Sequence, residues 1–317
     1  MPICGYLNWL FALDRSPKGE HASCCANDPK NCKRCGAGRC QRMEEDGIYA
    51  PDMMRRKGDG IPSEQENDGR FRSPEDFVRA IDESQVSAEF KEQMRRVVKS
   101  VTGKDGGFAD GFRKAPNGKP SRLDDWLWVV VRTPAFKEWF GDWELCVGAK
   151  ADGKDIPSDS ASKVVDDNGE PKICYHSTDA DFERFDLDRF GSTDPGYYGV
   201  ALYFSPHEQR QYGSRMIGVF LNCRRMVDFS DSDSMTGEQW DDYMAFQKEH
   251  VRILQSNESD RITNGMRKSM VKVSREFTNR MEKDGIDGFT ANYGLEIGVY
   301  SPSQVMIVTD ERKQKPN

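Results

Sequence analysis

From Ser162 onward the sequence consists of short runs of β-type residues separated by turn residues such as Asn168–Gly169. Such runs predict strands, because β-branched and aromatic side chains fit a pleated, half-buried surface. Two longer segments with helical spacing, Thr236–Glu249 and Ile262–Glu282, interrupt them. Helices that are grouped between strands, without regular alternation, indicate an α+β fold. The predicted strands are Val164–Val165, Ile173–Tyr175, Gly199–Phe204, Ile217–Leu221, Gly288–Thr290, Glu296–Tyr300 and Val305–Val308.

The stretch before Ser162 carries signals of helix starts. Ser73, Ser87 and Thr133 can each cap a helix, and a proline follows Ser73 and Thr133 directly, in the first helical turn. The aromatic segment Trp126–Trp143 could stack nucleic-acid bases. An aromatic cluster of this kind is more typical of a hydrophobic core or a docking surface. We therefore interpret the segment as structural and expect it to pack onto the next domain.

The composition argues against several classes of protein. A net charge of -7 disfavours wholesale electrostatic binding to nucleic acid, because such binding depends on Lys and Arg. The longest apolar run, Ile3–Leu13, is broken by Gly5 and Asn8 and is too short to span roughly 30 Å of hydrocarbon. Five of the nine cysteines lie within 17 residues, with no export signal before them. We expect neither a membrane helix nor a secretory signal, and a reducing, cytosolic setting.

These patterns divide the chain into five parts. Residues 1–45 form a Cys-rich head, and residues 46–70 are a linker with mixed charges, proline and glycine. Residues 71–145 form the helical and aromatic region. Residues 160–310 carry the β-rich domain, and residues 311–317 are a tail.

The head holds enough thiols for a tetrahedral zinc site. Cys32 and Cys35 form a Cys-x-x-Cys element, which presents two thiolates on one turn, and Cys40 and Cys25 would complete the set. Cys24 is an alternative to Cys25, and His21 is an alternative ligand. The second Cys-x-x-Cys pair of a standard finger is missing, so zinc ligation and a head with free thiols both stay open. Basic residues around the thiols suggest a module that contacts nucleic acid or a partner.

Three short motifs of the β-rich domain supply side chains suited to one kind of chemistry. They are Tyr175–Thr178, Gly199–Ser205 and Tyr293–Val305, and they contain a histidine, a tyrosine and a glutamate in that order. A reaction through an oxocarbenium-like ribose needs a carboxylate near the developing cation, and an aromatic wall suits a planar cationic ring. Considered alone, Glu296 lies between the apolar residues Leu295 and Ile297, as a solvent-facing residue of a strand would. Considered alone, His176 would be a core histidine.

Taken together, the motifs resemble the ADP-ribosyltransferase superfamily of the His-Tyr-Glu type, which includes diphtheria-toxin-like enzymes and poly(ADP-ribose) polymerases. They are most similar to transferase domains in polyvalent proteins of phages and mobile elements. The resemblance runs from about Ala161 to Val308 and includes Tyr175–Thr178, Tyr203–Ser205, Phe220–Cys223 and the motif that starts at Glu296. It implies a split β-sheet core with flanking helices. The preceding Arg132–Trp143 segment is similar to the one that often leads into such domains.

The resemblance also implies roles for individual residues. His176 would bind a ribose hydroxyl of NAD, and Tyr203 and Tyr212 would sandwich the nicotinamide, with Tyr212 on a helix that follows Pro206. Glu296 would accept the 2'-hydroxyl of the nicotinamide ribose and stabilise the oxocarbenium. The implied NAD-binding residues are Tyr175, His176, Ser177, Tyr203, Ser205 and Tyr212, and the implied catalytic residues are Glu296, His176 and Tyr203.

Two positions depart from the family pattern. Ser177 replaces the usual glycine, whose backbone pairs with the nicotinamide amide, and its Cβ restricts the backbone, so we expect a weaker contact. Gly294 stands where arginine-modifying relatives carry Glu or Gln, which disfavours arginine as the acceptor. Residues 194–198 are either a loop over NAD or a plain surface loop. His207 and His250 are assigned no catalytic role.

The expected function is therefore NAD-dependent mono-ADP-ribosylation of a macromolecule, either protein or nucleic acid. We expect a phage, toxin or host-conflict effector in the cytoplasm of the producing or infected bacterial cell, with an immunity or antitoxin protein as a further partner and no membrane partner. One alternative is an NAD glycohydrolase, and another is an inactive module that keeps only the binding shape. An RNase that uses His176, His207 and Glu296 is the weakest alternative.

Overall fold

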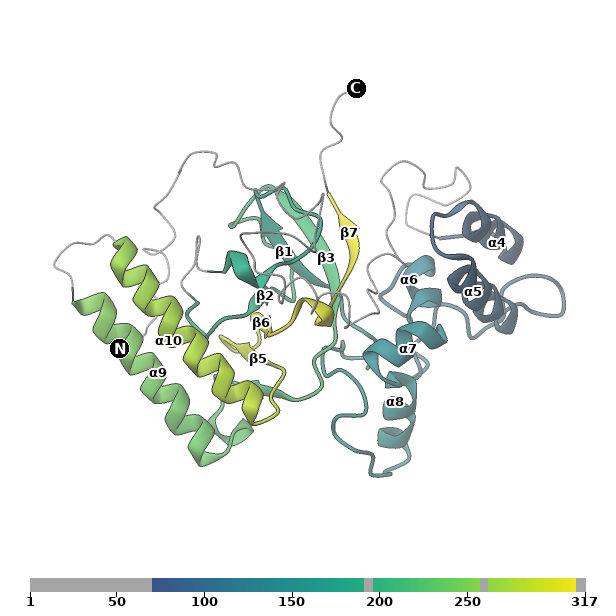
Figure 1. Cartoon of the computed structure of the whole chain (residues 1–317). Helices are drawn as coiled ribbons and strands as arrows, with labels where there is room; N and C mark the ends of the chain where they lie inside the picture. The colour runs from purple at the N-terminus through teal and green to yellow at the C-terminus, as the bar shows by residue number, and fades with distance from the viewer. Residues whose placement is uncertain (1–69, 191–195, 257–261, 312–317) are drawn as a thin grey trace, which may run out of the picture. The chain divides into compact units, whose positions relative to one another are not determined.

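The computed structural model describes residues 70–190, 196–256 and 262–311 (Figure 1). The predicted head with its cysteine ligands lies outside these residues, as do nearly all of the linker and the tail. The boundaries proposed between the parts stay predictions.

The region before the β-rich domain is helical, as predicted. The side-chain oxygens of Ser73, Ser87 and Thr133 each accept a hydrogen bond from the backbone amide three residues ahead, which confirms all three caps. The helices are α4 (Pro74–Glu83), α5 (Ala88–Ser100), α6 (Asp125–Val130), α7 (Pro134–Phe140) and α8 (Trp143–Ala151).

The aromatic segment of this region forms a core that is shared with the β-rich domain. Trp126, Phe136 and their neighbours are buried in one cluster with Phe220 and Met306, which belong to the strands. The indole of Trp139 donates a hydrogen bond to the Ser303 carbonyl at 3.0 Å. The structural interpretation of the segment is therefore confirmed.

A buried ion pair joins the same two parts of the chain. The guanidinium of Arg132 lies 2.8 Å from the Glu170 carboxylate, and the side chains are only 9% and 1% exposed. Arg132 also lies over the ring of Trp128, at 3.7 Å from its centroid. Burial lowers the pKa of Arg132, while the Glu170 hydrogen bond and charge act in the opposite direction. This pair ties the connection between α6 and α7 to the turn at Asp166–Glu170.

The β-rich domain contains two small sheets. One has the strand order β1-β3-β7 and the other the order β2-β6-β5-β4. All neighbours are antiparallel except β4 and β5, which are parallel and therefore need a long connection. The strands are β1 (Cys174–Thr178), β2 (Leu202–Phe204), β3 (Arg215–Leu221), β4 (Met226–Asp228), β5 (Gly288–Ala291), β6 (Glu296–Val299) and β7 (Val305–Asp310).

Six of the seven predicted strands are present, and the fold is α+β, as predicted. The prediction of a strand at Val164–Val165 was wrong: Val165 forms only an isolated bridge with Pro171 across the turn at Asp166–Glu170. The predicted strand Gly199–Phe204 is shorter than expected, because residues 196–199 form a turn ahead of β2. The three-residue strand β4 was not predicted. Short 3-10 turns complete the described part of the chain at Leu187–Arg189 (η2), Ser232–Ser234 (η3) and Pro302–Gln304 (η4).

Two long helices form the connection between β4 and β5. They are α9 (Gly237–Gln255) and α10 (Asn264–Lys283), which lie side by side next to the β5 and β6 strands (Figure 1). A capping box of Thr236 and Gln239 starts α9, as the sequence predicts. Phe246 of α9 stacks on Phe277 of α10 with ring centroids 4.4 Å apart. This helix pair covers the face of the sheet that carries Phe289.

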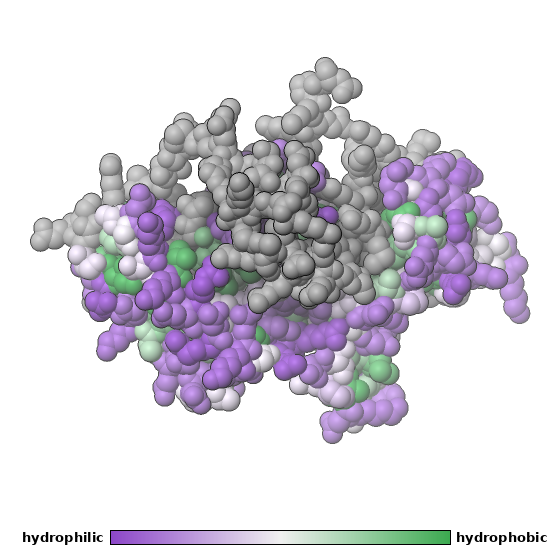
Figure 2. Space-filling view, viewed as in Figure 1, coloured by the Kyte–Doolittle hydropathy of each residue, from purple (hydrophilic) through white to green (hydrophobic). Residues whose placement is uncertain are grey.

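The described surface is mainly hydrophilic on the side seen in Figure 2, where apolar residues gather only in small separate patches. Among the described helices, none is both long and apolar enough to cross a membrane.

Replacement of Arg132 by Met should lower the free energy of unfolding by about 3–5 kcal/mol, because Glu170 is then a buried carboxylate without its cation. The double variant Arg132→Met/Glu170→Met should regain most of this loss. Arg122–Asp167 is a matched control, since it joins neighbouring segments at 3.1 Å but is 64% and 85% exposed. Urea denaturation measures all three variants. A loss in Arg132→Met no larger than in Arg122→Met contradicts the assignment.

Candidate active site at the split between β1 and β2

The two sheets meet at one pair of residues. Tyr175 and Ser205 exchange two backbone hydrogen bonds of 2.8 Å, which joins β1 to β2. In an antiparallel ladder the next pair of this kind would be Ser177 and Tyr203. The described structure has no backbone bond between them, and instead Nδ1 of His176 lies 2.9 Å from the Tyr203 carbonyl oxygen. The imidazole thus bonds to the Tyr203 carbonyl oxygen, which in a continuous sheet would accept from a backbone amide of β1. The sheet splits at this point.

Within the described residues, the split leaves the backbone groups of Ser177 without a strand partner on the β2 side. Successive residues of a strand direct their N–H and C=O groups to opposite neighbours, so Ser177, like Tyr175, directs them toward β2. Ser177 lies in regular strand β1, and its φ is not positive. The serine at this position therefore requires no unusual backbone conformation, and the expected weaker contact with the nicotinamide amide stays a prediction.

Five of the predicted residues share one face of the sheet. The β2–β6 register pairs Phe204 with Ile297, and its extension by one residue places Ser205 opposite Glu296. Residues opposite each other, or two apart on a strand, face the same side. The shared face therefore carries Tyr175, Ser177, Tyr203, Ser205 and Glu296.

The side chain of His176 belongs to the other face. Its ring lies near those of Phe182, Phe185 and Phe204, with centroids 6.2, 5.2 and 5.8 Å away. Burial lowers the pKa of His176; the Tyr203 carbonyl opposes this effect, and the charge of Arg215 adds to it. A carbonyl only accepts, so Nδ1 carries the proton and Nε2 is left as an acceptor. The predicted ribose contact of His176 is not tested by this geometry.

Arg215 secures the loop that packs against His176, and sequence reasoning missed it. Its guanidinium makes two 2.7 Å bonds to the Asp310 carboxylate and donates to the carbonyls of Ala180 and Phe182, both at 2.9 Å. The only sequence signal was an arginine at the start of an otherwise apolar strand. Such a residue, when buried, needs a partner.

Tyr203 is held by its hydroxyl. The hydroxyl donates to the Gly199 carbonyl at 2.7 Å and accepts from the Tyr198 amide at 3.2 Å, while the ring packs edge-on against Phe289. Tyr198 is a second residue that sequence reasoning missed. Burial raises the pKa of Tyr198, and the charge of Glu296 raises it further.

Tyr212 does not lie on a helix, contrary to the prediction. Residues 206–214 form turns and extended backbone, and the Tyr212 side chain is 47% exposed. Gly213 explains the difference: its φ is 156°, and a Cβ there would lie 2.1 Å from the carbonyl carbon of Thr178. The close approach places this turn against the end of β1. The predicted contact of Tyr212 with nicotinamide stays a prediction.

Glu296 is half-buried at the start of β6, beside an unusual turn. Asn292, Tyr293 and Gly294 all have positive φ, of 51°, 56° and 79°. The Tyr293 amide donates to the Ser230 hydroxyl at 2.8 Å, yet its side chain is 88% exposed. A constrained backbone thus presents Tyr293 and the 45% exposed Leu295 next to the glutamate.

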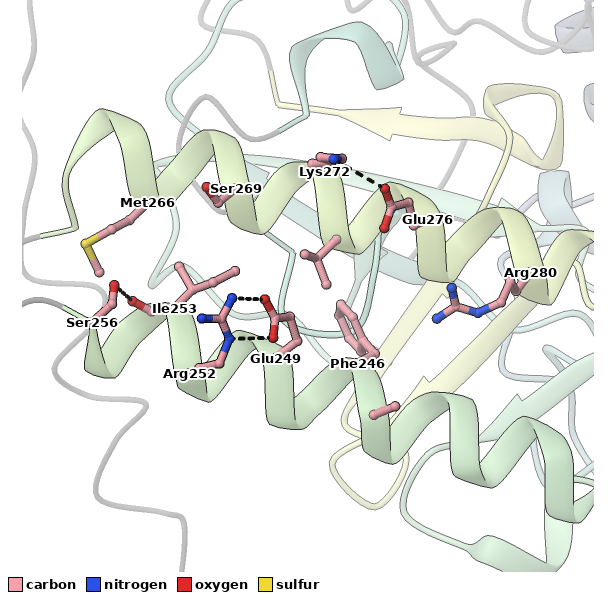
Figure 3. Close-up of a pocket in the computed structure, with 12 residues that line it drawn as sticks. Phe246, Glu249, Arg252, Ile253, Ser256, Met266, Ser269, Lys272, Glu276 and Arg280 are labelled. Atoms are coloured by element: carbon pink, nitrogen blue, oxygen red, sulfur yellow. Dashed lines mark hydrogen bonds and ion pairs between the residues drawn. The ribbon is translucent and has the colours of Figure 1, made fainter.

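A groove of about 690 Å³ lies elsewhere, between α9 and α10 (Figure 3). None of the predicted site residues lines it. Four of its charged side chains pair with each other, Arg252 with Glu249 and Lys272 with Glu276, and Arg280 pairs with Asp242. The predicted residues that share one face lie instead at the split in the sheet.

Over residues 70–190, 196–256 and 262–311, no group of three or more His, Cys, Asp or Glu side chains could hold a metal ion. The predicted zinc ligands Cys25, Cys32, Cys35 and Cys40 lie outside these ranges.

Removal of the His176 ring in His176→Ala should let β1 and β2 pair further. The amide of Ser177 should then exchange with deuterium at least about 10-fold more slowly, because it gains the Tyr203 carbonyl as a partner. Exchange measured by NMR checks this, with His207→Ala, an exposed histidine, as the control. An unchanged or faster exchange of Ser177 contradicts the proposed effect of the ring.

Comparison with known proteins finds one family for this part of the chain. Residues 166–315 match the family model described as ADP-Ribosyltransferase in polyvalent proteins, which covers just under half of the chain. No curated protein and no solved structure matches the chain. Residues 166–315 of this chain therefore belong to the family of ADP-ribosyltransferase domains in polyvalent proteins.

Proposed function

We propose that this protein transfers a single ADP-ribose unit from NAD to a macromolecule. The observation that carries the proposal is the shared face around the split, where Ser177, Tyr203 and Glu296 face the same side of the sheet. The family match supports it, because members of such families usually use NAD as substrate.

In the proposed reaction the bond between the ribose C1' and the nicotinamide nitrogen breaks, and nicotinamide leaves with the bonding electrons. The carboxylate of Glu296 stabilises the positive ribose, and the ring of Tyr203 contacts the nicotinamide. The backbone groups of Ser177 bind the nicotinamide amide. The acceptor then bonds to C1' and loses its proton.

The alternatives are less well supported. In an NAD glycohydrolase water is the acceptor, and the exposed Tyr293 and Leu295 beside Glu296 would have no use. An inactive binding module was suggested by Ser177, but that residue fits a regular strand without strain. An RNase is disfavoured because the side chains of His176 and Glu296 lie on opposite faces and His207 is exposed.

The biological setting is part of the proposal. We propose a phage, toxin or host-conflict effector that acts in the bacterial cytoplasm on a protein or nucleic acid and meets an immunity or antitoxin partner. The resemblance to domains of polyvalent proteins supports this setting. The zinc site of the head is proposed on its cysteine spacing alone.

Replacement of Glu296 by Gln should lower NAD turnover about 100-fold or more, because it removes charge that stabilises the transition state. Release of nicotinamide from NAD measures the rate. Glu238→Gln, at an exposed glutamate in the first turn of α9, is the control and should behave as wild type. Wild-type turnover in Glu296→Gln would falsify the catalytic role.

A substitution of Tyr293 should affect the transfer of ADP-ribose and the hydrolysis of NAD differently. Tyr293→Asn keeps a residue that tolerates the positive φ but removes the exposed ring. We expect transfer of labelled ADP-ribose to acceptors in a lysate to fall about 10-fold or more, since a contact aromatic is lost. NAD hydrolysis should change less than about twofold, and Tyr293→Phe should retain transfer. A parallel loss of both activities, or a loss of neither, contradicts an acceptor role.

A further inference from the structure

The α9–α10 helix pair binds the turn that precedes β2 through side chains. From α9, Nε2 of Gln247 donates to the Tyr197 carbonyl at 2.8 Å. From α10, the Ser274 hydroxyl donates to the Gly196 carbonyl at 3.1 Å. The Thr278 hydroxyl accepts from the Val200 amide at 2.8 Å and donates to its carbonyl at 3.2 Å. Segment 196–200 is therefore bound to both helices by four hydrogen bonds.

The same segment holds the phenol of Tyr203. The Gly199 carbonyl and the Tyr198 amide both bond to the Tyr203 hydroxyl. Gly199 allows α10 to come this close, because its φ is 105° and a Cβ there would lie 2.7 Å from the Thr278 hydroxyl oxygen. Hydrogen bonds thus join the helix pair to segment 196–200 and this segment to the side chain of Tyr203.

His250 of α9 sets the direction of the Ser274 bond. Its Nε2 lies 3.1 Å from the Ser274 hydroxyl, which already gives its one proton to Gly196. When the Ser274 hydroxyl donates to Gly196, the imidazole donates to it from Nε2, and the buried Nδ1 has no hydrogen-bond partner in the described part of the chain. Burial lowers the pKa of His250 to about 4, although the Met270 carbonyl and Glu249 act in the opposite direction. The imidazole is thus neutral near pH 7, as this arrangement requires.

The sequence gives no hint of this arrangement, since His250 was expected to have no role at a charged end of a helix. It is instead fully buried. A buried imidazole with one nitrogen that makes no hydrogen bond lowers the stability of the fold. Such a residue is expected where the hydrogen bond of its other nitrogen has a role. Here the other nitrogen, Nε2, bonds to the Ser274 hydroxyl, which bonds in turn to the Gly196 carbonyl.

We infer that Ser274 and Thr278 of α10, with His250 behind Ser274, are positioning residues that fix segment 196–200 and through it Tyr203 and Tyr198 beside Glu296. None of them touches substrate in this account. The inserted helix pair is then part of the donor site and has a role beyond covering the sheet. The expected effect on the KM for NAD rests on the proposed function, whereas the expected effect on the structure of segment 196–200 does not.

The test uses two variants that remove hydroxyls and one matched control. Ser274→Ala deletes the link to Gly196, and Thr278→Val is nearly isosteric and deletes both bonds to Val200. Ser269→Ala is the control, because Ser269 is exposed on the same helix. Hydrogen–deuterium exchange of the full chain reports on the amides of Tyr198 and Val200.

We expect both variants to speed exchange of these two amides at least about 10-fold, with exchange in β3 and β7 unchanged. The KM for NAD should rise about 3- to 10-fold with kcat changed less, because a misplaced wall weakens binding of ground state and transition state alike. Unchanged exchange at Tyr198 and Val200, or a similar increase in β3 and β7, overturns the inference. If the wild type does not turn over NAD, the proposed function fails, and the exchange data alone still decide the positioning role.

Discussion

The hydrogen bond from His176 to the Tyr203 carbonyl is the interaction on which the site depends. At this point β1 and β2 stop pairing, although their register would allow a further backbone pair between Ser177 and Tyr203. A buried carbonyl needs a donor, and the imidazole supplies it without closing the sheet. The N–H and C=O groups of Ser177 then have no strand partner on the β2 side among the described residues. In the proposed function these backbone groups bind the nicotinamide amide.

Two helical parts keep this arrangement in place from different sides. The region before the domain is joined to it by the Arg132–Glu170 pair and by the core around Phe136 and Phe220. The inserted helix pair packs against Phe289 and bonds to the turn that holds Tyr203. A catalytic constellation needs such support, because small displacements of its groups lower the rate strongly.

Features with a local cause could be predicted from the sequence. The caps at Ser73 and Thr133 follow from hydroxyls placed before a helix, and the strands follow from β-type runs bounded by turns. The three-residue strand β4 could not be found, because Met226–Asp228 has too few residues for a pattern and pairs with a strand about sixty residues away. The helix expected at Tyr212 was wrong, since the approach of Gly213 to Thr178 is a tertiary contact. The burial of His250 and the opposite faces of His176 and Glu296 also emerge only from packing and register.

The central claim is that NAD binds at the split and contacts the face with Ser177, Tyr203 and Glu296. A crystal structure of Glu296→Gln with NAD tests it most directly, since the variant should bind substrate without consuming it. The account predicts that the nicotinamide amide bonds to the backbone of Ser177 while His176 keeps its bond to the Tyr203 carbonyl. NAD bound elsewhere, for example in the groove between α9 and α10, or a sheet closed between Ser177 and Tyr203, would contradict it.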